Sequence, residues 1–211
     1  MIAIIDYRAG NLTSVARALD YLKEPYKITA DEKLLIESDR LIFPGVGAAG
    51  DAMANLKHRA LDRLLPRLVG EGKPMLGICL GTQVIYEHSE ENNTECLGIV
   101  PGTVKKFPDD LRDRGQPLKI PHMGWNTITF EKKHPVFEGL PADAEFYFVH
   151  SYYPAPSDEN WIIGRTDYGI RFCSAVAMKN LIAVQFHPEK SGRPGLKLLA
   201  NFCRWEGKNA E

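Results

Sequence analysis

A cysteine stands between two glycines in residues 74–84, PMLGICLGTQV, where Gly77 and Gly81 each lie two positions from Cys79. A chain that turns sharply from a strand into a helix is crowded at the bend, so residues without a Cβ are best tolerated beside it. The same spacing around serine, G-x-S-x-G, marks a turn that exposes a nucleophile. The pattern predicts that Cys79 is a nucleophile at such a turn. A buried cysteine with incidental glycines is the alternative.

A histidine and a carboxylate follow far downstream, in the segment QFHPEKSG. Pro188 disfavours the helical conformation for His187. In an extended segment, the side chains of His187 and Glu189 project to the same side because the strand period is two. Glu189 can then orient His187 as a base for Cys79, in the chain order Cys, His, Glu. We therefore predict a catalytic triad of Cys79, His187 and Glu189.

The other histidines are weaker candidates for the base. His150 follows an apolar strand and could face Cys79, but no acid stands at a spacing suited to orient it. His58, His88 and His134 lie in charged segments that we expect to be exposed.

Residues 45–50, GVGAAG, match the G-x-G-x-x-G pattern of dinucleotide-binding loops. That pattern also requires an acid at the end of the next strand, about twenty residues further on, and here this distance falls in ALDRLL, a predicted helix. Another use fits better, because a loop over residues 44–47 can present a backbone N–H at the end of a strand. We predict that the loop at Gly47 and the N–H of Leu80 form an oxyanion hole, and that the two glycines make this peptide easy to flip.

Composition and charge limit the classes of function. The chain has 211 residues, 44% of them hydrophobic and 25% charged, with a net charge of −1, which is typical of a globular protein without bulk attraction to nucleic acid or membranes. We expect one domain over residues 1–211 and, without a signal segment or a long apolar run, a cytoplasmic location. Four widely spaced cysteines without a CxxC pair argue against a zinc site and a disulfide framework. No metal-binding cluster and no cofactor is predicted.

The hydrophobic pattern predicts an α/β fold. In residues 1–95, short apolar strands alternate with helices, which indicates a three-layer, mostly parallel sheet flanked by helices. The later pattern indicates additional antiparallel strands in the C-terminal half, and then a final helix. The expected strands are 1–6, 26–29, 40–44, 74–79, 97–107, 126–130, 145–153, 161–169, 171–178 and 181–186; the expected helices are 11–22, with Asn11 as N-cap, two within 48–71, 82–91 and 193–206.

The chain resembles the class I glutamine amidotransferases over nearly its whole length. The shared segments are IDYRAGNLTSV, FPGVGA, GICLGTQ, PHMGWN, FYFVHSYY and VQFHPEKSG. PGVG and PHMGWN direct the resemblance to the glutaminase subunits of imidazole glycerol phosphate synthases. One departure is Arg8, which stands where these proteins often have glycine.

The resemblance implies that Cys79 attacks the side-chain amide of L-glutamine. His187 would protonate the departing ammonia and then activate water against the thioester, while Glu189 orients His187. Further glutamine-binding residues implied by the resemblance are Gly47, Gln83, Ser151 and Tyr152.

The resemblance also implies a partner. Ammonia would pass to a separate, barrel-shaped cyclase subunit in a heterodimer, which joins it to a phosphoribulosyl-formimino aminoimidazole carboxamide nucleotide in histidine biosynthesis. The products would be imidazole glycerol phosphate and AICAR, and PHMGWN, with Trp125, would lie at a surface near the partner. Two alternatives are a glutaminase of another pathway, such as pyridoxal phosphate synthesis, and a non-catalytic binding protein on the same fold.

Overall fold

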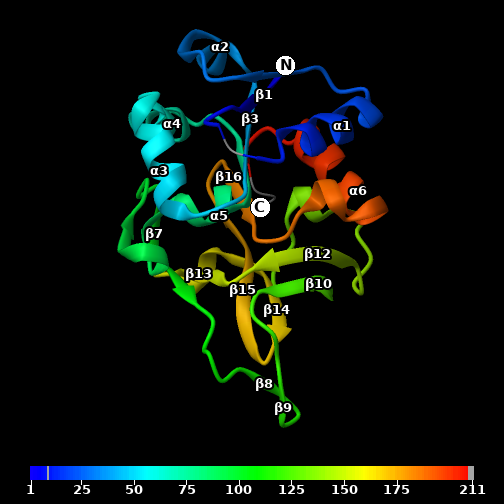
Figure 1. Ribbon diagram of the computed structural model, residues 1–211. Coiled ribbons are helices and arrows are strands. Elements are labelled where there is room, and N and C mark those ends of the chain that lie inside the picture. The colour runs from blue at the N-terminus through cyan, green and yellow to red at the C-terminus, as the bar shows by residue number, and fades with distance from the viewer. Residues whose placement is uncertain (9, 209–211) are drawn as a thin grey trace.

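The computed structural model describes residues 1–8 and 10–208, and its centre is an eight-stranded sheet (Figure 1). Its strands follow the order β11-β14-β15-β16-β4-β3-β1-β2. The parallel part comprises β1 (Ile2–Ile5), β2 (Tyr26–Thr29), β3 (Arg40–Gly45), β4 (Met75–Cys79) and β16 (Leu181–Val184). The antiparallel part comprises β11 (Thr129–Phe130), β14 (Ile162–Tyr168) and β15 (Ile170–Met178). The predicted α/β sheet with antiparallel additions in the C-terminal half is confirmed.

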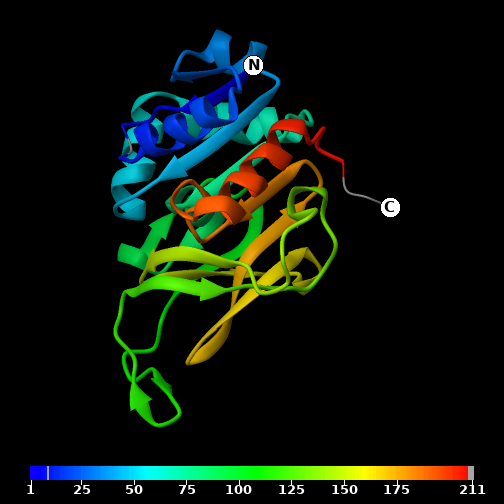
Figure 2. The ribbon, with the colours of Figure 1, turned by 90° about the vertical axis from the view of Figure 1, so that its right-hand side faces the viewer.

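Helices cover both faces of this sheet. On one face α1 (Leu12–Leu22) packs beside α6 (Gly192–Arg204), and Figure 2 shows both helices in front of the sheet. On the other face lie α3 (Ala49–His58) and α4 (Leu61–Gly70), and α2 (Glu32–Glu37) buries Leu35 in the same apolar cluster. Strands β1, β4 and β16 are buried along their whole length, as continuous apolar strands between two helical layers must be.

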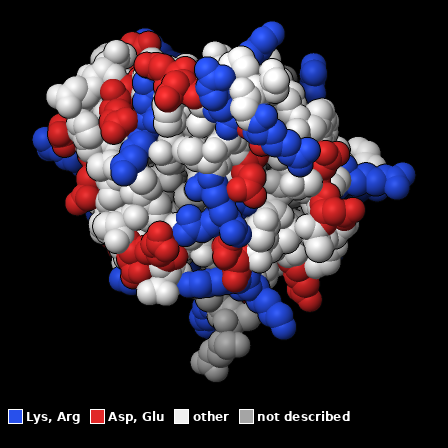
Figure 3. Space-filling view, turned by 90° about the horizontal axis from the view of Figure 1, so that it is seen from below, with Lys and Arg blue, Asp and Glu red and all other residues white. Residues whose placement is uncertain are grey.

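The remaining strands form smaller sheets. A four-stranded sheet has the order β13-β7-β5-β6, and β10 pairs with β12 in antiparallel register. A short hairpin of β8 and β9 projects from the body (Figure 1), and basic and acidic side chains are interspersed on the face that carries it (Figure 3). The bounds are β5 Tyr86–Ser89, β6 Thr94–Glu95, β7 Val100–Lys106, β8 Arg112–Asp113, β9 Gln116–Pro117, β10 His122–Thr127, β12 Glu145–His150 and β13 Tyr152–Pro156. Short 3-10 turns are η1 Glu91–Asn93, η2 Pro135–Phe137, η3 Glu159–Trp161 and η4 Pro188–Lys190.

One predicted helix is wrong. The expected helix over residues 82–91 ends early, since α5 spans only Leu80–Val84 and β5 follows. The carbonyl groups of residues 84–86 accept hydrogen bonds from the backbone N–H groups of residues 97–99. These long-range bonds occupy the acceptors that a continuing helix would use, so the chain pairs as a strand instead. By contrast, ALDRLL opens helix α4 as expected, with Ala60 as the N-cap and the helix beginning at Leu61, which supports the rejection of a dinucleotide fingerprint.

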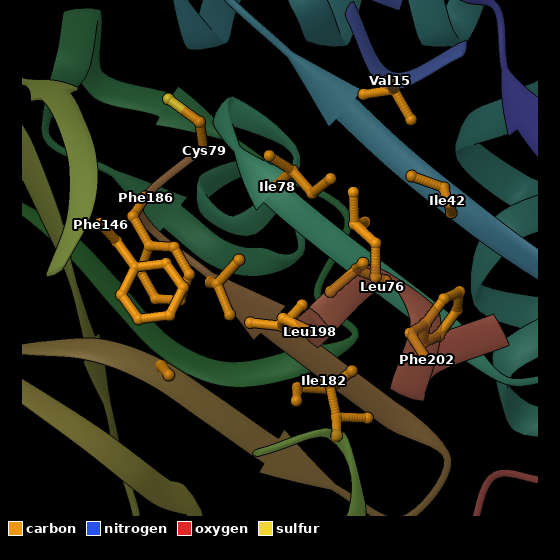
Figure 4. Close-up of a cluster of buried hydrophobic side chains, with 14 of the residues drawn as sticks. Val15, Ile42, Leu76, Ile78, Cys79, Phe146, Ile182, Phe186, Leu198 and Phe202 are labelled. Carbon is orange, nitrogen blue, oxygen red and sulfur yellow. The ribbon is translucent and has the colours of Figure 1, made fainter. Parts of the chain in front are cut away.

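The junction of β4 and α5 explains both glycines of the motif. A Cβ on Gly81 would lie 1.8 Å from the carbonyl oxygen of Phe43 in β3, and one on Gly77 would lie 3.0 Å from the Cβ of Ala183 in β16. The turn can therefore pack between β3 and β16 only without these side chains. Figure 4 shows Cys79 at the end of the strand that carries Leu76 and Ile78 into the apolar cluster between the sheet and α6.

Among the described residues, no helix has the length and apolarity to cross a bilayer.

The packing around the glycines predicts that alanine substitutions at two helical glycines, Gly81 and Gly50, change stability by different amounts. We expect Gly81→Ala to destabilise the protein by about 3 kcal/mol, because the added methyl group meets backbone that cannot change rotamer. The control is Gly50→Ala in α3, where the nearest atom would be 3.7 Å away; there the change should be neutral or stabilising by up to about 1 kcal/mol. Urea unfolding of both variants measures the difference. Equal stability of the two variants would contradict the steric account.

Candidate active site

Cys79 occupies a strained turn. Its backbone angles are φ 52° and ψ −108°, a conformation that residues with a Cβ rarely adopt. Such strain persists only where the surrounding structure enforces it, and it is concentrated at functional sites. The strain here is held by β4 on one side and α5 on the other. The side chain is buried, since the residue is only 6% exposed.

His187 and Glu189 form a buried pair. The Nδ1 of His187 lies 2.7 Å from Oε1 of Glu189, and both side chains are almost inaccessible to solvent. His187 has extended backbone angles, as predicted from Pro188, but the expectation of a continuous extended segment is wrong, because η4 (Pro188–Lys190) is a 3-10 turn. Ser191 fixes this turn: its Oγ donates to the carbonyl of His187 at 2.6 Å and accepts the N–H of Tyr147 at 3.0 Å.

The charges around His187 favour its protonated form. Burial lowers the pKa of His187, but the Cys79 thiolate and the Glu189 carboxylate outweigh burial and raise that pKa to about 10. Among residues 1–8 and 10–208, Nε2 of His187 has no partner that meets hydrogen-bond geometry, and since Nδ1 faces Glu189, Nε2 is the nitrogen left to interact with the nearby Cys79. Asn11 is the N-cap residue of α1, as predicted, but its side chain makes no capping hydrogen bond, and its amide Nδ2 donates instead to Oε1 of Glu189. The arrangement places an oriented imidazolium beside Cys79.

A cavity of about 270 Å³ lies at Cys79 and gathers most of the predicted site residues. Its lining comprises Val46, Gly47, Cys79, Leu80, Gln83, Glu91, Pro121, Val149, His150, Ser151 and Tyr152. It thus contains both predicted oxyanion residues and all the residues that the resemblance assigns to glutamine. His187 and Glu189 are not part of the lining and lie buried in the protein.

His150 lines this cavity, but both of its ring nitrogens are engaged. Its Nδ1 lies 2.7 Å from the carbonyl oxygen of Tyr152, and its Nε2 lies 3.0 Å from Nδ1 of His122. The Nε2 of His122 lies in turn 3.2 Å from the amide nitrogen of Asn126. Burial lowers the pKa of His150 to about 3 and that of His122 to about 4, so both are neutral. Neither nitrogen of His150 is free to accept a proton from Cys79.

The remaining histidines lie away from the cavity lining. His58 is exposed, as expected, and His88 is partly exposed beside Glu95. The expectation that His134 is exposed is wrong, because it is 5% exposed and its Nδ1 accepts the N–H of Val136. The proline that follows His134 begins η2, and the imidazole satisfies an N–H of that turn.

Two further residues at the site escaped the sequence analysis. Gln185 is fully buried, and its amide lies between Gln83 and Cys79: its Oε1 accepts from Gln83 at 3.0 Å and its Nε2 lies 3.8 Å from the sulfur. A polar residue in the apolar run LIAVQF, two positions before His187, was the available signal. Glu91 accepts the N–H of Ala49 at 2.6 Å and so fixes the chain just after the glycine loop, and no spacing in the sequence predicts this contact.

Arg8, where the resemblance led us to expect glycine, has a backbone conformation that glycine adopts without strain. It has φ 66°, in the left-handed region where glycine is unstrained. The N–H of Arg8 donates to the carboxylate of Asp6 at 3.0 Å, which helps to hold the arginine in this conformation.

The family model for class-I glutamine amidotransferases matches residues 3–205, and the chain belongs to this family. Solved structures have the same fold: a protein described as glutamine amidotransferase superposes with a TM-score of 0.74 at 17% identity, over 97% of this chain and 100% of that one. The glutaminase domain of Trypanosoma brucei CTPS, with bound acivicin, superposes with a TM-score of 0.63 at 18% identity, over 100% and 97% of the two chains.

Curated relatives are much closer in sequence. The chain is 53% identical over 206 residues to the imidazole glycerol phosphate synthase subunit HisH of Maridesulfovibrio salexigens, covering 97% of each chain. It is 50% identical over 210 residues to the subunit of the same name from Methylococcus capsulatus, covering 97% of this chain and 96% of the relative. Within the family, its sequence is therefore that of a HisH-type glutaminase.

The electrostatics predict how Cys79 reacts with iodoacetamide as the pH changes. The imidazolium of His187 persists below its pKa of about 10 and is lost as the pH rises through that value, so it favours the Cys79 thiolate throughout the neutral range. We expect alkylation of Cys79 at a nearly constant rate from pH 6 to 8. In His187→Gln the rate should rise about tenfold per pH unit, as for an ordinary thiol below its pKa of about 8.5.

His150→Gln is the matched control and should keep the flat profile. Peptide mapping should place the label on Cys79, because burial raises the pKa of Cys96 to about 11 and those of Cys173 and Cys203 to about 12. A steep profile in the unmodified sequence, or label on another cysteine, would show that the thiolate assignment is wrong.

Proposed function

We propose that residues 1–211 act as one glutamine amidotransferase domain, the glutaminase subunit of an imidazole glycerol phosphate synthase. The observation that carries the proposal is the buried His187–Glu189 pair beside the strained Cys79, at a cavity lined by Gln83 and Ser151. The relatives named HisH, at about 50% identity over nearly the whole chain, support the particular pathway.

The first half of the reaction forms a thioester. The Cys79 thiolate attacks the carbon of the glutamine side-chain amide, and the C=O π bond breaks to leave an oxyanion. Backbone N–H groups at Gly47 and Leu80 stabilise this oxyanion. The C–N bond then breaks, and His187 delivers its Nε2 proton to the departing ammonia.

The second half hydrolyses the thioester. His187, now neutral, takes a proton from water, which attacks the thioester carbon and releases glutamate. The proton returns the imidazole to its starting form, beside the regenerated Cys79 thiolate. Through both halves Glu189 accepts a hydrogen bond from Nδ1–H of His187 and keeps Nε2 directed toward the reacting atoms.

Glutamine is held by the cavity walls. Gln83 donates to the carbonyl oxygen of Tyr152 at 3.1 Å, and His150 lies 2.7 Å from the same oxygen. These contacts fix the chain at Ser151 and Tyr152 against helix α5. The glutamine-binding residues are therefore preorganised by neighbours that do not themselves need to move.

A partner surface adjoins the cavity. Pro121 lines the cavity and directly precedes β10, on which Met123 and Trp125 are 62% and 55% exposed. Because alternate residues of a strand share a face, the two apolar side chains stand together while His122 points inward. We propose that the cyclase subunit covers this surface in a heterodimer and receives the ammonia directly.

A glutaminase that is active without its acceptor wastes glutamine, so we expect the isolated chain to be nearly silent. The oxyanion donor at Gly47 is the proposed switch, and loss of one such donor costs about 10²- to 10³-fold in turnover. The measurement is glutamate release by the isolated chain, by the chain with the cyclase subunit, and by that complex with its nucleotide substrate.

Turnover should rise by about 10²-fold or more from the first to the third condition, and Cys79→Ala should be inactive in all three. Equal turnover of the isolated chain and the liganded complex would refute the switch. Activation only by a partner from another pathway would instead support the alternative assignment.

A further inference from the structure

Two buried tyrosine hydroxyls lack a hydrogen-bond partner in the described part of the chain. They belong to Tyr7 and Tyr86, which are 1% and 0% exposed. The other such side-chain atoms among these residues are Nε2 of His187 and Oε2 of Glu189, both in the proposed triad. A buried donor without a partner costs free energy, so it calls for an explanation. The location of Tyr7 suggests a role for its hydroxyl.

Tyr7 lies against the start of the oxyanion loop, residues 45–47. A Cβ on Gly45 would lie 2.0 Å from the Tyr7 hydroxyl and 3.1 Å from the Cβ of Leu80, so the hydroxyl touches Gly45 close to Leu80. The Tyr7 ring packs edge-on against Phe43 in β3, with 5.2 Å between centroids. Burial, and after it the negative charge of Cys79, raises the pKa of Tyr7, so its hydroxyl stays protonated.

The oxyanion loop separates two cavities. Val46 and Gly47 line the Cys79 cavity and also a second cavity of about 410 Å³. Tyr7 lines the second cavity, together with Arg8 and residues of α3, but not the first. Tyr7 is therefore not among the residues that line the cavity proposed for glutamine.

The backbone at Gly47 suits a peptide that changes orientation. Gly47 has φ 105°, and glycine adopts positive and negative φ with similar ease. When the Val46–Gly47 peptide turns its N–H toward Cys79, its carbonyl turns the opposite way because the peptide is planar. The second cavity offers space for that carbonyl on the side where Tyr7 lies.

We propose that Tyr7 is a positioning residue for the oxyanion loop: its hydroxyl donates a hydrogen bond to the Val46 carbonyl when the Gly47 N–H faces Cys79. The inference rests on the proposed function, since it requires a glutaminase whose loop is rearranged by its partner. The Tyr7 hydroxyl has no hydrogen-bond partner among the described residues of the present structure. It gains one when the Gly47 N–H faces Cys79. Tyr7 thereby favours the active orientation.

The test compares Tyr7→Phe with Tyr86→Phe, which removes an equally buried hydroxyl without a partner from β5. Glutamate release is measured for the isolated chain and for the complex with cyclase and nucleotide. In Tyr7→Phe the ratio of stimulated to unstimulated turnover should fall about three- to tenfold, the factor that one neutral hydrogen bond provides. The KM for glutamine should not change, because Tyr7 does not line that cavity.

Tyr86→Phe should leave the ratio as in the unmodified chain. An unchanged ratio in Tyr7→Phe, or an equal fall in both variants, would overturn the proposal. Thermal unfolding supplies a second readout: Tyr7→Phe should melt at or above the unmodified protein, and clear destabilisation would make the hydroxyl structural and sink the idea. The unmodified chain is measured in the same assays, so its failure to release glutamate with any partner would refute the proposed function itself.

Discussion

The close contact of α5 with β3, at Gly81 and the carbonyl oxygen of Phe43, is the constraint on which the site depends. There is no room for a Cβ at Gly81, so glycine there allows α5 to pack against β3 directly after the sharp turn at which Cys79 has a positive φ. The parallel register places Gly45 opposite Cys79, which brings the glycine loop to the level of the sulfur. Strand pairing and one steric exclusion thus place the proposed nucleophile and the proposed oxyanion loop side by side.

His187, the proposed base, is brought close to Cys79 by the neighbouring strand. β16 pairs with β4 in parallel, with Val184 opposite Ile78, so the chain that leads to His187 ends beside the chain that leads to Cys79. The N–H of His187 donates to the carbonyl of Tyr147, which ties the turn to β12. The residues of the proposed triad therefore follow two adjacent parallel strands, as expected for α/β proteins, whose sites gather at the carboxyl ends of the strands.

Local patterns in the sequence predicted most of the fold and the core of the site. Glycines flanking Cys79 and the proline after His187 act on their own neighbours, and their consequences could be derived without knowledge of distant contacts. The helix expected over 82–91 failed because residues 97–99 take its carbonyl acceptors, a contact that periodicity does not encode. The same reason applies to the contacts of Gln185 and Glu91 and to the neutral pair of His122 and His150. Their partners lie far away in the sequence.

The proposed mechanism requires a covalent intermediate between Cys79 and glutamine. The most direct measurement is mass spectrometry of the chain, acid-quenched during turnover with its partner, after digestion to peptides. We expect a γ-glutamyl adduct on the peptide that contains Cys79, and we expect hydroxylamine to remove it because hydroxylamine cleaves thioesters. Glutamate release at full rate without any adduct on Cys79, or an adduct on a different residue, would show that Cys79 is not the nucleophile.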